Sequence, residues 1–141
     1  MDQYITEQRQ KQDALWPTVA PLPGALKLLQ HLHDHSIPIA IATGSARRKL
    51  PLKTSHLPHM FDLFDGHIVC GDEIERGKPF PDIFLAAAAR LGRRVGQGDY
   101  TMVDEAAQLE RSKGLIFEDA VPHFFSGRFT NMLLMLILVR Y

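Results

Sequence analysis

The chain has 141 residues, roughly the size of one ordinary domain, with a 45% apolar and 23% charged composition that is typical of a globular protein. Its 16 basic and 16 acidic residues cancel, which argues against nucleic acid or an anionic membrane as the main partner. The single cysteine, Cys70, cannot form an internal disulfide and favours a reducing compartment, so we predict a cytoplasmic location.

Neither end of the sequence predicts a targeting or membrane segment. The polar stretch 1–13 lacks the apolar core of a signal peptide. The apolar run MLLMLILV (132–139) has 8 residues, against the roughly 20 that span a bilayer, and we expect a strand buried on both faces.

Amphipathic helices alternate with short apolar runs along the chain. The predicted helices cover 2–15, 23–35, 46–54, 81–91 and 105–111, and the predicted strands cover 37–44, 67–71, 114–120 and 132–139. Three prolines in WPTVAPLPG (16–24) end the first helix, and Pro58 is expected to end regular structure after the third. The pattern predicts an α/β fold with a parallel sheet flanked by helices.

Ligands of such sheets lie beyond the carboxyl ends of the strands. The first candidate there is the segment Thr43-Gly44-Ser45, which offers hydroxyl groups, a small residue and helix-start N–H groups as an anion cradle. The alternative is an ordinary helix N-cap by Thr43 or Ser45.

The second candidate is Lys78 in RGKPFPD (76–82), where Pro79 and Pro81 stiffen a loop that follows a buried strand. Such a loop can aim an ammonium group into a cleft. A solvated lysine is the ordinary alternative.

The third candidate is the pair Glu118-Asp119, which emerges from an apolar strand. Two adjacent carboxylates repel each other unless a cation lies between them, and Mg²⁺ prefers such hard oxygen ligands. The alternative is an N-cap by Asp119 beside an exposed glutamate. Together, a cradle, a lysine and a metal site are the equipment for phosphoryl transfer.

Two other polar clusters are less informative. His31 and His35 in HLHDH are four residues apart and could share a helix face, but no further Cys or His cluster supplies the remaining metal ligands, and these residues and His33 are expected to be solvated. The basic run ARRK (46–49) is either a solvated helix start or an attractor of phosphorylated substrates.

Three segments together resemble the haloacid dehalogenase-like hydrolase superfamily, in the branch that contains pseudouridine-5'-phosphatases and other sugar-phosphate phosphatases. They are IPIAIATGS (37–45), GDEIERGKPFPDIFLAAAARLG (71–92) and GLIFEDA (114–120). The resemblance implies a Rossmann-like core and Mg²⁺-dependent hydrolysis of small phosphorylated metabolites. It implies that Thr43, Gly44 and Ser45 bind phosphate, that Lys78 balances charge, that Asp82 supports the lysine loop, and that Glu118 and Asp119 bind Mg²⁺.

The same resemblance implies an aspartate nucleophile in a D-x-D motif, and the 141 residues contain no D-x-D. Asp62 and Asp65 in FDLFDGH are three apart and do not match. We therefore expect 1–20 to be a remnant of a helical cap and 21–141 an incomplete core that lacks the first strand, with an exposed apolar sheet edge and an inactive chain. The alternative function is a non-catalytic remnant with an interaction or regulatory role.

Overall fold

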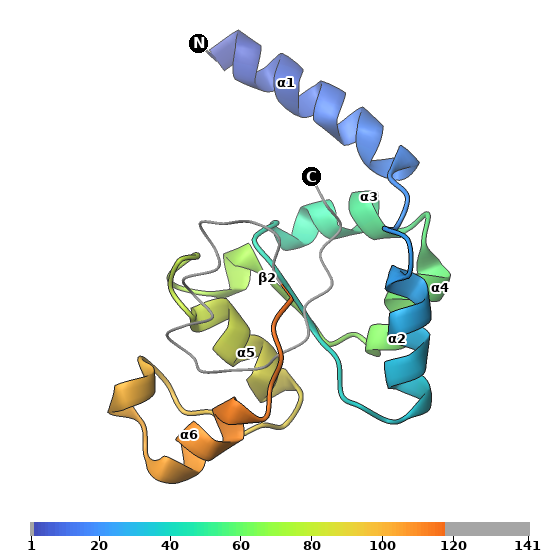
Figure 1. The fold of residues 1–141 in the computed structure, drawn as a ribbon. Coiled ribbons are helices and arrows are strands. Elements are labelled where there is room, and N and C mark those ends of the chain that lie inside the picture. Colours follow the sequence, from blue (N-terminus) through green and yellow to red (C-terminus); the bar gives the residue numbers. More distant parts are fainter. Residues whose placement is uncertain (1, 118–141) are drawn as a thin grey trace.

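The computed structural model describes residues 2–117, so the predicted strand 132–139 and the end of GLIFEDA lie outside the described residues. The elements, in chain order, are α1 (Asp2–Leu15), η1 (Trp16–Thr18), α2 (Ala25–Asp34), β1 (Ile41–Thr43), η2 (Arg47–Lys49), α3 (Leu50–Thr54), α4 (Pro58–Phe61), η3 (Asp62–Phe64), β2 (Ile68–Cys70), η4 (Gly71–Glu73), α5 (Asp82–Arg90), η5 (Tyr100–Met102) and α6 (Glu105–Ser112). Figure 1 shows α5 on one side of the two strands and α2 with α4 on the other.

The two described strands form a parallel pair. Ile41 is in register with Ile68, and Thr43 is in register with Cys70. Parallel neighbours need a crossover connection, and here residues 44–67 supply it through short helices. The predicted α/β class with a parallel sheet is confirmed.

The core forms where the strands meet α5. The first two residues of β1 and all three of β2 are buried, which explains why both read as continuous apolar runs. Phe84 of α5 is fully buried, and burying a side chain of this size stabilises the fold by about 2–3 kcal/mol. In the leucine stripe of α2, Leu29 is buried and Leu28 is 39% exposed, as the helical spacing predicts.

The predicted helix at 46–54 is divided. It begins as the 3-10 turn η2, and the α-helix α3 starts only at Leu50. The reason is Pro51, which lacks an N–H and is tolerated only in the first turn of an α-helix.

The expectation that Pro58 ends regular structure is wrong. Pro58 is instead the first residue of the short helix α4. Its fixed φ and its missing N–H suit the first helical position, where no intrahelical partner exists for an N–H.

The segment 114–117 returns to the core. Ile116 packs against the cluster that contains Ile39 and Ile41 of the first strand region, and Leu115 has the backbone geometry of a β-bridge. Leu115 and Phe117 are 39% and 41% exposed. The segment 114–117 thus contributes Ile116 to the core.

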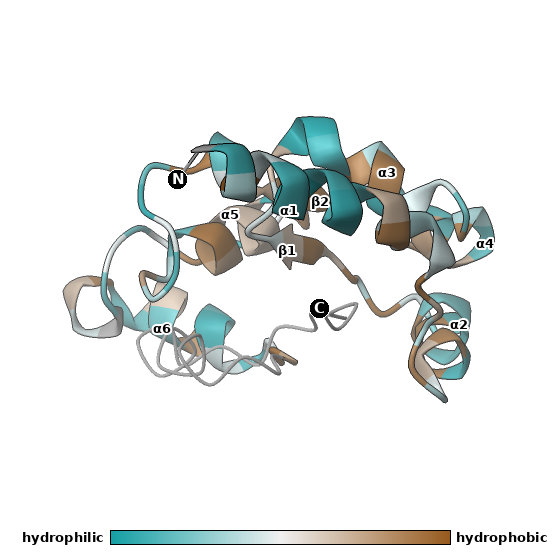
Figure 2. Ribbon diagram, turned by 90° about the horizontal axis from the view of Figure 1, so that it is seen from above, coloured by the Kyte–Doolittle hydropathy of each residue, from teal (hydrophilic) through white to brown (hydrophobic). Residues whose placement is uncertain are grey.

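Hydropathy differs between the outlying helix and the centre. In Figure 2, α1 is largely hydrophilic, whereas β1 is hydrophobic. No helix among residues 2–117 has the length and apolarity required to cross a membrane.

Arg111 is the one charged side chain that is buried among residues 2–117, and it holds α6 to the loop before it. Its Nε donates to the Val95 carbonyl at 2.6 Å and a terminal nitrogen donates to the Gly98 carbonyl at 3.1 Å. Asp104 caps the start of α6 by accepting from the Ala107 N–H at 2.8 Å.

We predict that Arg111→Met lowers the free energy of unfolding by about 2–3 kcal/mol, because two carbonyls lose a charged donor. Urea unfolding followed by circular dichroism measures the change. Arg94→Met is the control, since Arg94 is exposed, and it should leave the midpoint unchanged. Equal midpoints for both variants would contradict a structural role for Arg111.

Candidate active site

The Thr43-Gly44-Ser45 segment lies at the carboxyl end of β1, directly against the end of β2. The Gly71 N–H donates to the Ser45 carbonyl at 3.0 Å. A Cβ on Gly71 would lie 2.4 Å from the Gly44 carbonyl oxygen, a distance that real Cβ atoms do not adopt. The loop therefore depends on a glycine at the start of the turn that follows the neighbouring strand.

The Thr43 hydroxyl organises this loop from within. The Ser45 N–H donates to Thr43 Oγ1 at 3.2 Å. That N–H therefore points inward in this structure. Because the hydroxyl accepts this bond, its own proton remains to donate to a ligand oxygen.

The helix-start N–H groups are not presented as the sequence predicted. Ala46, and not Thr43 or Ser45, is the N-cap of η2, without a side-chain cap. The N–H of Arg47 donates to Asp72 Oδ1 at 2.9 Å. The alternative of an N-cap by Thr43 or Ser45 is therefore wrong, because Ala46 is the N-cap and Asp72 on the neighbouring turn accepts from the Arg47 N–H.

Lys53 was not recognised from the sequence as a candidate site residue. Its Nζ donates to Ser45 Oγ at 2.8 Å and lies 3.8 Å from the centre of the Trp16 ring. The ammonium group thus holds the Ser45 side chain and places a positive charge beside the loop. The available signal was the i, i+4 spacing of Lys49 and Lys53, which puts both on one helix face.

Lys78 lies in the loop that joins the end of β2 to α5, so it shares a sheet edge with the cradle. It is half-buried, and its Nζ lies 5.3 Å from the centre of the Phe84 ring, unlike a fully solvated lysine. Arg76 in the same loop donates two hydrogen bonds to Asp82, at 2.9 and 2.8 Å. Asp82 is the first residue of α5, so this bidentate pair ties the loop to the helix.

Cys70, Asp72 and Glu73 bring their ligand atoms within 4.8 Å of one another. Two arginines already neutralise Glu73. Arg90 donates to it at 2.8 Å, and Arg47 both pairs with it and donates to the Ile68 carbonyl at 2.7 Å. We interpret this group as the support of the cradle rather than as a metal site.

Burial raises the pKa of the Cys70 thiol, while nearby Arg47 acts in the opposite direction. The thiol is therefore protonated near neutral pH and behaves as a packed apolar group.

The predicted Mg²⁺ ligands Glu118 and Asp119 lie outside the described residues. Two adjacent carboxylates match the oxygen ligands that Mg²⁺ prefers. Asp72 and Glu73, on the turn that meets the cradle, are engaged as described. They do not replace the predicted pair.

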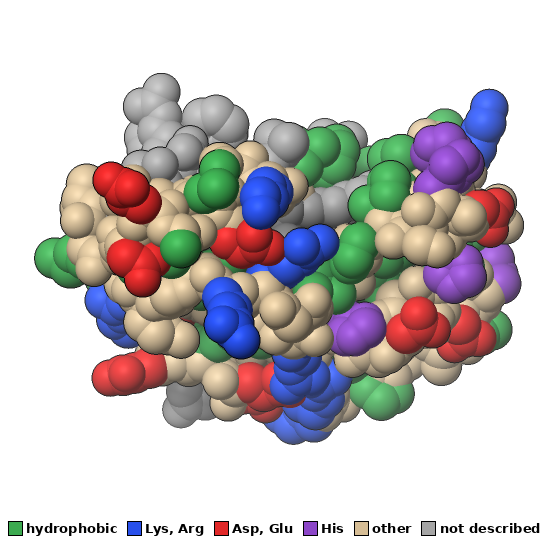
Figure 3. Space-filling view, turned by 90° about the horizontal axis from the view of Figure 1, so that it is seen from below, with side chains coloured by type: hydrophobic (Ala, Val, Ile, Leu, Met, Phe, Trp, Pro, Cys, Tyr) green, Lys and Arg blue, Asp and Glu red, His purple; other side chains and the backbone are tan. Residues whose placement is uncertain are grey.

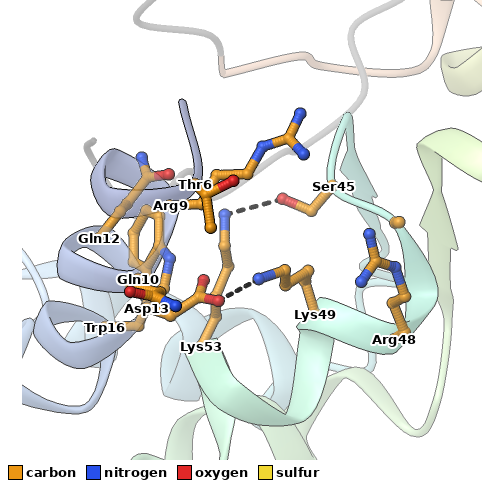
Figure 4. A pocket seen from close by; sticks show the side chains of 11 residues that line it. Thr6, Arg9, Gln10, Gln12, Asp13, Trp16, Ser45, Arg48, Lys49 and Lys53 are labelled. Atoms are coloured by element: carbon orange, nitrogen blue, oxygen red, sulfur yellow. Dashed lines mark hydrogen bonds and ion pairs between the residues drawn. The ribbon is translucent and has the colours of Figure 1, made fainter. Parts of the chain in front are cut away.

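A cavity of about 470 Å³ opens beside Ser45, between α1 and the η2–α3 segment (Figure 4). Four of its lining residues are basic, namely Arg9, Arg48, Lys49 and Lys53, and one is acidic, namely Asp13. Lys49 of η2 forms an ion pair with Asp13 of α1, so the two walls of the cavity are joined. Part of the basic run at 46–49 thus faces a cavity.

Among residues 2–117, no histidine lines this cavity. Figure 3 shows histidine side chains on the side of the molecule where α2 lies. His31 and His35 stack with ring centres 4.2 Å apart, and His35 Nδ1 contacts the His31 carbonyl oxygen at 2.7 Å. In the described part of the chain no histidine belongs to a group of three potential metal ligands.

Comparison with known proteins identifies the family. The family model for haloacid dehalogenase-like hydrolases matches residues 3–120. The chain belongs to the haloacid dehalogenase-like hydrolases. The three segments that suggested this superfamily all begin within the matched region, and the prediction is confirmed.

Relatives of the chain include proteins named as phosphatases. The chain is 40% identical over 121 residues to (DL)-glycerol-3-phosphatase 1 of Arabidopsis thaliana, which covers 84% of the chain and 36% of the relative. It is 42% identical over 94 residues to a probable pseudouridine-5'-phosphatase of Drosophila melanogaster, a match that covers 64% of the chain and 40% of the relative. It is 37% identical over 132 residues to a probable pseudouridine-5'-phosphatase of Saccharomyces cerevisiae, a match that covers 91% of the chain and 51% of the relative. The chain thus spans between 36% and 51% of the length of these relatives.

We predict that Gly71→Ala destabilises the folded chain by about 1–3 kcal/mol, because the new methyl group meets the Gly44 carbonyl. Gly77→Ala is the matched control, since a Cβ there meets nothing within 4 Å. Thermal unfolding of the two variants measures the difference. If both variants unfold at the same temperature, the Gly44 loop can shift at little cost and the close approach is not required.

Cys70 should react slowly with a thiol reagent at about pH 7 and faster as the pH rises, because its raised pKa and burial keep thiolate scarce. The folded state holds this proton more tightly than the unfolded chain does. The contribution of the Cys70 thiol to the stability of the fold is therefore present below the pKa of the unfolded chain, about 8.5, and is lost as the pH rises through the pKa of the folded state. Rapid labelling of the folded chain at neutral pH, equal to that of the denatured chain, would contradict this.

Proposed function

We propose that this chain carries the phosphate-binding part of a Mg²⁺-dependent phosphomonoester hydrolase that acts on small sugar or nucleotide phosphates. The observation that carries the proposal is the Thr43-Gly44-Ser45 loop, held at the carboxyl end of β1 by its backbone contact with Gly71. Ligands of open parallel sheets bind at this edge. The relatives' names support a small phosphorylated metabolite as the ligand.

Each proposed site residue has one role in this proposal. The Thr43 hydroxyl donates to a phosphoryl oxygen, and Lys78 supplies a positive charge from a loop that Arg76 and Asp82 hold in place. Glu118 and Asp119 would hold Mg²⁺, which supplies neutralisation of the phosphate charge when bound. Residues 1–20 are proposed as part of a helical cap and 21–141 as the core domain.

We further propose that the chain as given does not turn over substrate. It contains no D-x-D pair, and an aspartate nucleophile is needed to form an aspartyl-phosphate. The cradle and the lysine still bind phosphate without it. The single cysteine supports a reducing compartment such as the cytoplasm.

Two measurements on the purified chain test this proposal. With Mg²⁺ present, we expect negligible hydrolysis of p-nitrophenyl phosphate, together with phosphate binding in a ³¹P NMR titration. Lys78→Ala should weaken that binding about tenfold, because a charge-assisted contact is lost. The matched control is Lys27→Ala, an exposed lysine on α2.

Either of two results would contradict the proposal. Clear Mg²⁺-dependent turnover, abolished by Lys78→Ala but not by Lys27→Ala, would show that another group of this chain attacks phosphorus. Failure of the wild-type chain to bind phosphate would remove the phosphate-binding role.

A further inference from the structure

The cavity beside Ser45 extends the candidate phosphate site toward α1. Ser45 and Ala46 form part of its wall, so a ligand whose phosphate lies on the cradle has space to continue into it. A volume of about 470 Å³ is within the usual range for small-molecule sites. Thr6, Gln10 and Gln12 of α1 add polar groups that suit a hydroxylated ligand.

The basic residues that line this cavity fall into two sets. Lys49 pairs with Asp13, and Lys53 donates to Ser45 and lies over the Trp16 ring, so these two have structural partners. Arg9 and Arg48 are exposed and make no hydrogen bond or ion pair within residues 2–117. In Figure 4, Arg9 extends from α1 toward the side formed by the Ser45 loop.

Two arginines without partners in the described chain face one polar cavity from opposite walls. Their planar guanidinium groups match carboxylate and phosphate oxygens. The local charge also favours an anion, since one acidic side chain accompanies four basic ones and is already paired.

We propose that this cavity binds a second anionic group of the substrate, a carboxylate or a second phosphate, between Arg9 and Arg48. The substrate class is then a small hydroxylated phosphomonoester with an anion at its far end. This inference rests on the proposed phosphate site, because the first phosphate occupies the Thr43-Gly44-Ser45 loop. A ligand that bridges α1 and the loop also draws the two walls together.

The test uses binding rather than turnover, with two matched ligand pairs in ³¹P NMR titrations of the full chain at low ionic strength. Glycerol 3-phosphate is compared with 3-phosphoglycerate, which differs by a carboxylate. Fructose 6-phosphate is compared with fructose 1,6-bisphosphate, which differs by a phosphate. We expect the doubly anionic member of at least one pair to bind about tenfold more tightly, and the pair that shows the effect identifies the second group.

Variants assign that preference to the cavity. Arg9→Gln and Arg48→Gln should each reduce the preference several-fold, and the double variant should abolish it while glycerol 3-phosphate binds as before. Arg94→Gln is the matched control, an exposed arginine that does not line the cavity, and it should retain the preference. Thermal unfolding checks that all variants are folded.

The outcomes separate this inference from the proposed function. Equal affinities within both ligand pairs, or a preference that survives in the double variant, would overturn the second anion site and leave the phosphate site standing. Failure of every ligand to bind, inorganic phosphate included, would overturn the proposed function and this inference together.

Discussion

The structure of the candidate site depends on one backbone contact, between the loop that follows β1 and the turn that follows β2. Gly71 donates its N–H to the Ser45 carbonyl and leaves no room for a Cβ beside the Gly44 carbonyl. The parallel register that places Thr43 beside Cys70 delivers both segments to the same edge. Without this approach, the Gly44-Ser45 segment would lose its backbone contact with the turn after β2.

Charge is distributed unevenly around this contact. On the side of β2, the carboxylates of Asp72 and Glu73 are bound by the Arg47 N–H and by the guanidinium groups of Arg47 and Arg90. On the side of α1, basic side chains line an open cavity. Neutralising the acidic groups behind the loop leaves positive charge at its front, which is the arrangement that an anionic ligand requires.

The N-terminal helix contributes to this arrangement through a small number of anchors. Trp16 is buried, Lys53 lies over its ring, and Asp13 pairs with Lys49. Figure 1 shows that α1 otherwise lies apart from the body formed by β1, β2 and α5. Among residues 2–117, these anchors join α1 to the segment that bears the loop, so the Trp16–Lys53 and Asp13–Lys49 contacts fix the spacing of the two cavity walls.

The sequence by itself determined the elements and their order. Apolar runs, leucine spacing, and the prolines and glycine that bound α5 predicted β1, β2, α2 and α5, because hydrophobic periodicity and helix-boundary chemistry are local properties. The motifs predicted the family and placed Thr43, Gly44, Ser45 and Lys78 at strand ends. Only the tertiary structure decided that Asp72 takes the Arg47 N–H, that Lys53 holds Ser45, and that Arg9 and Arg48 face one cavity. Such pairings join residues 8 to 39 positions apart across a crossover and a helix, and local periodicity carries no information about which side chains the folded backbone brings together.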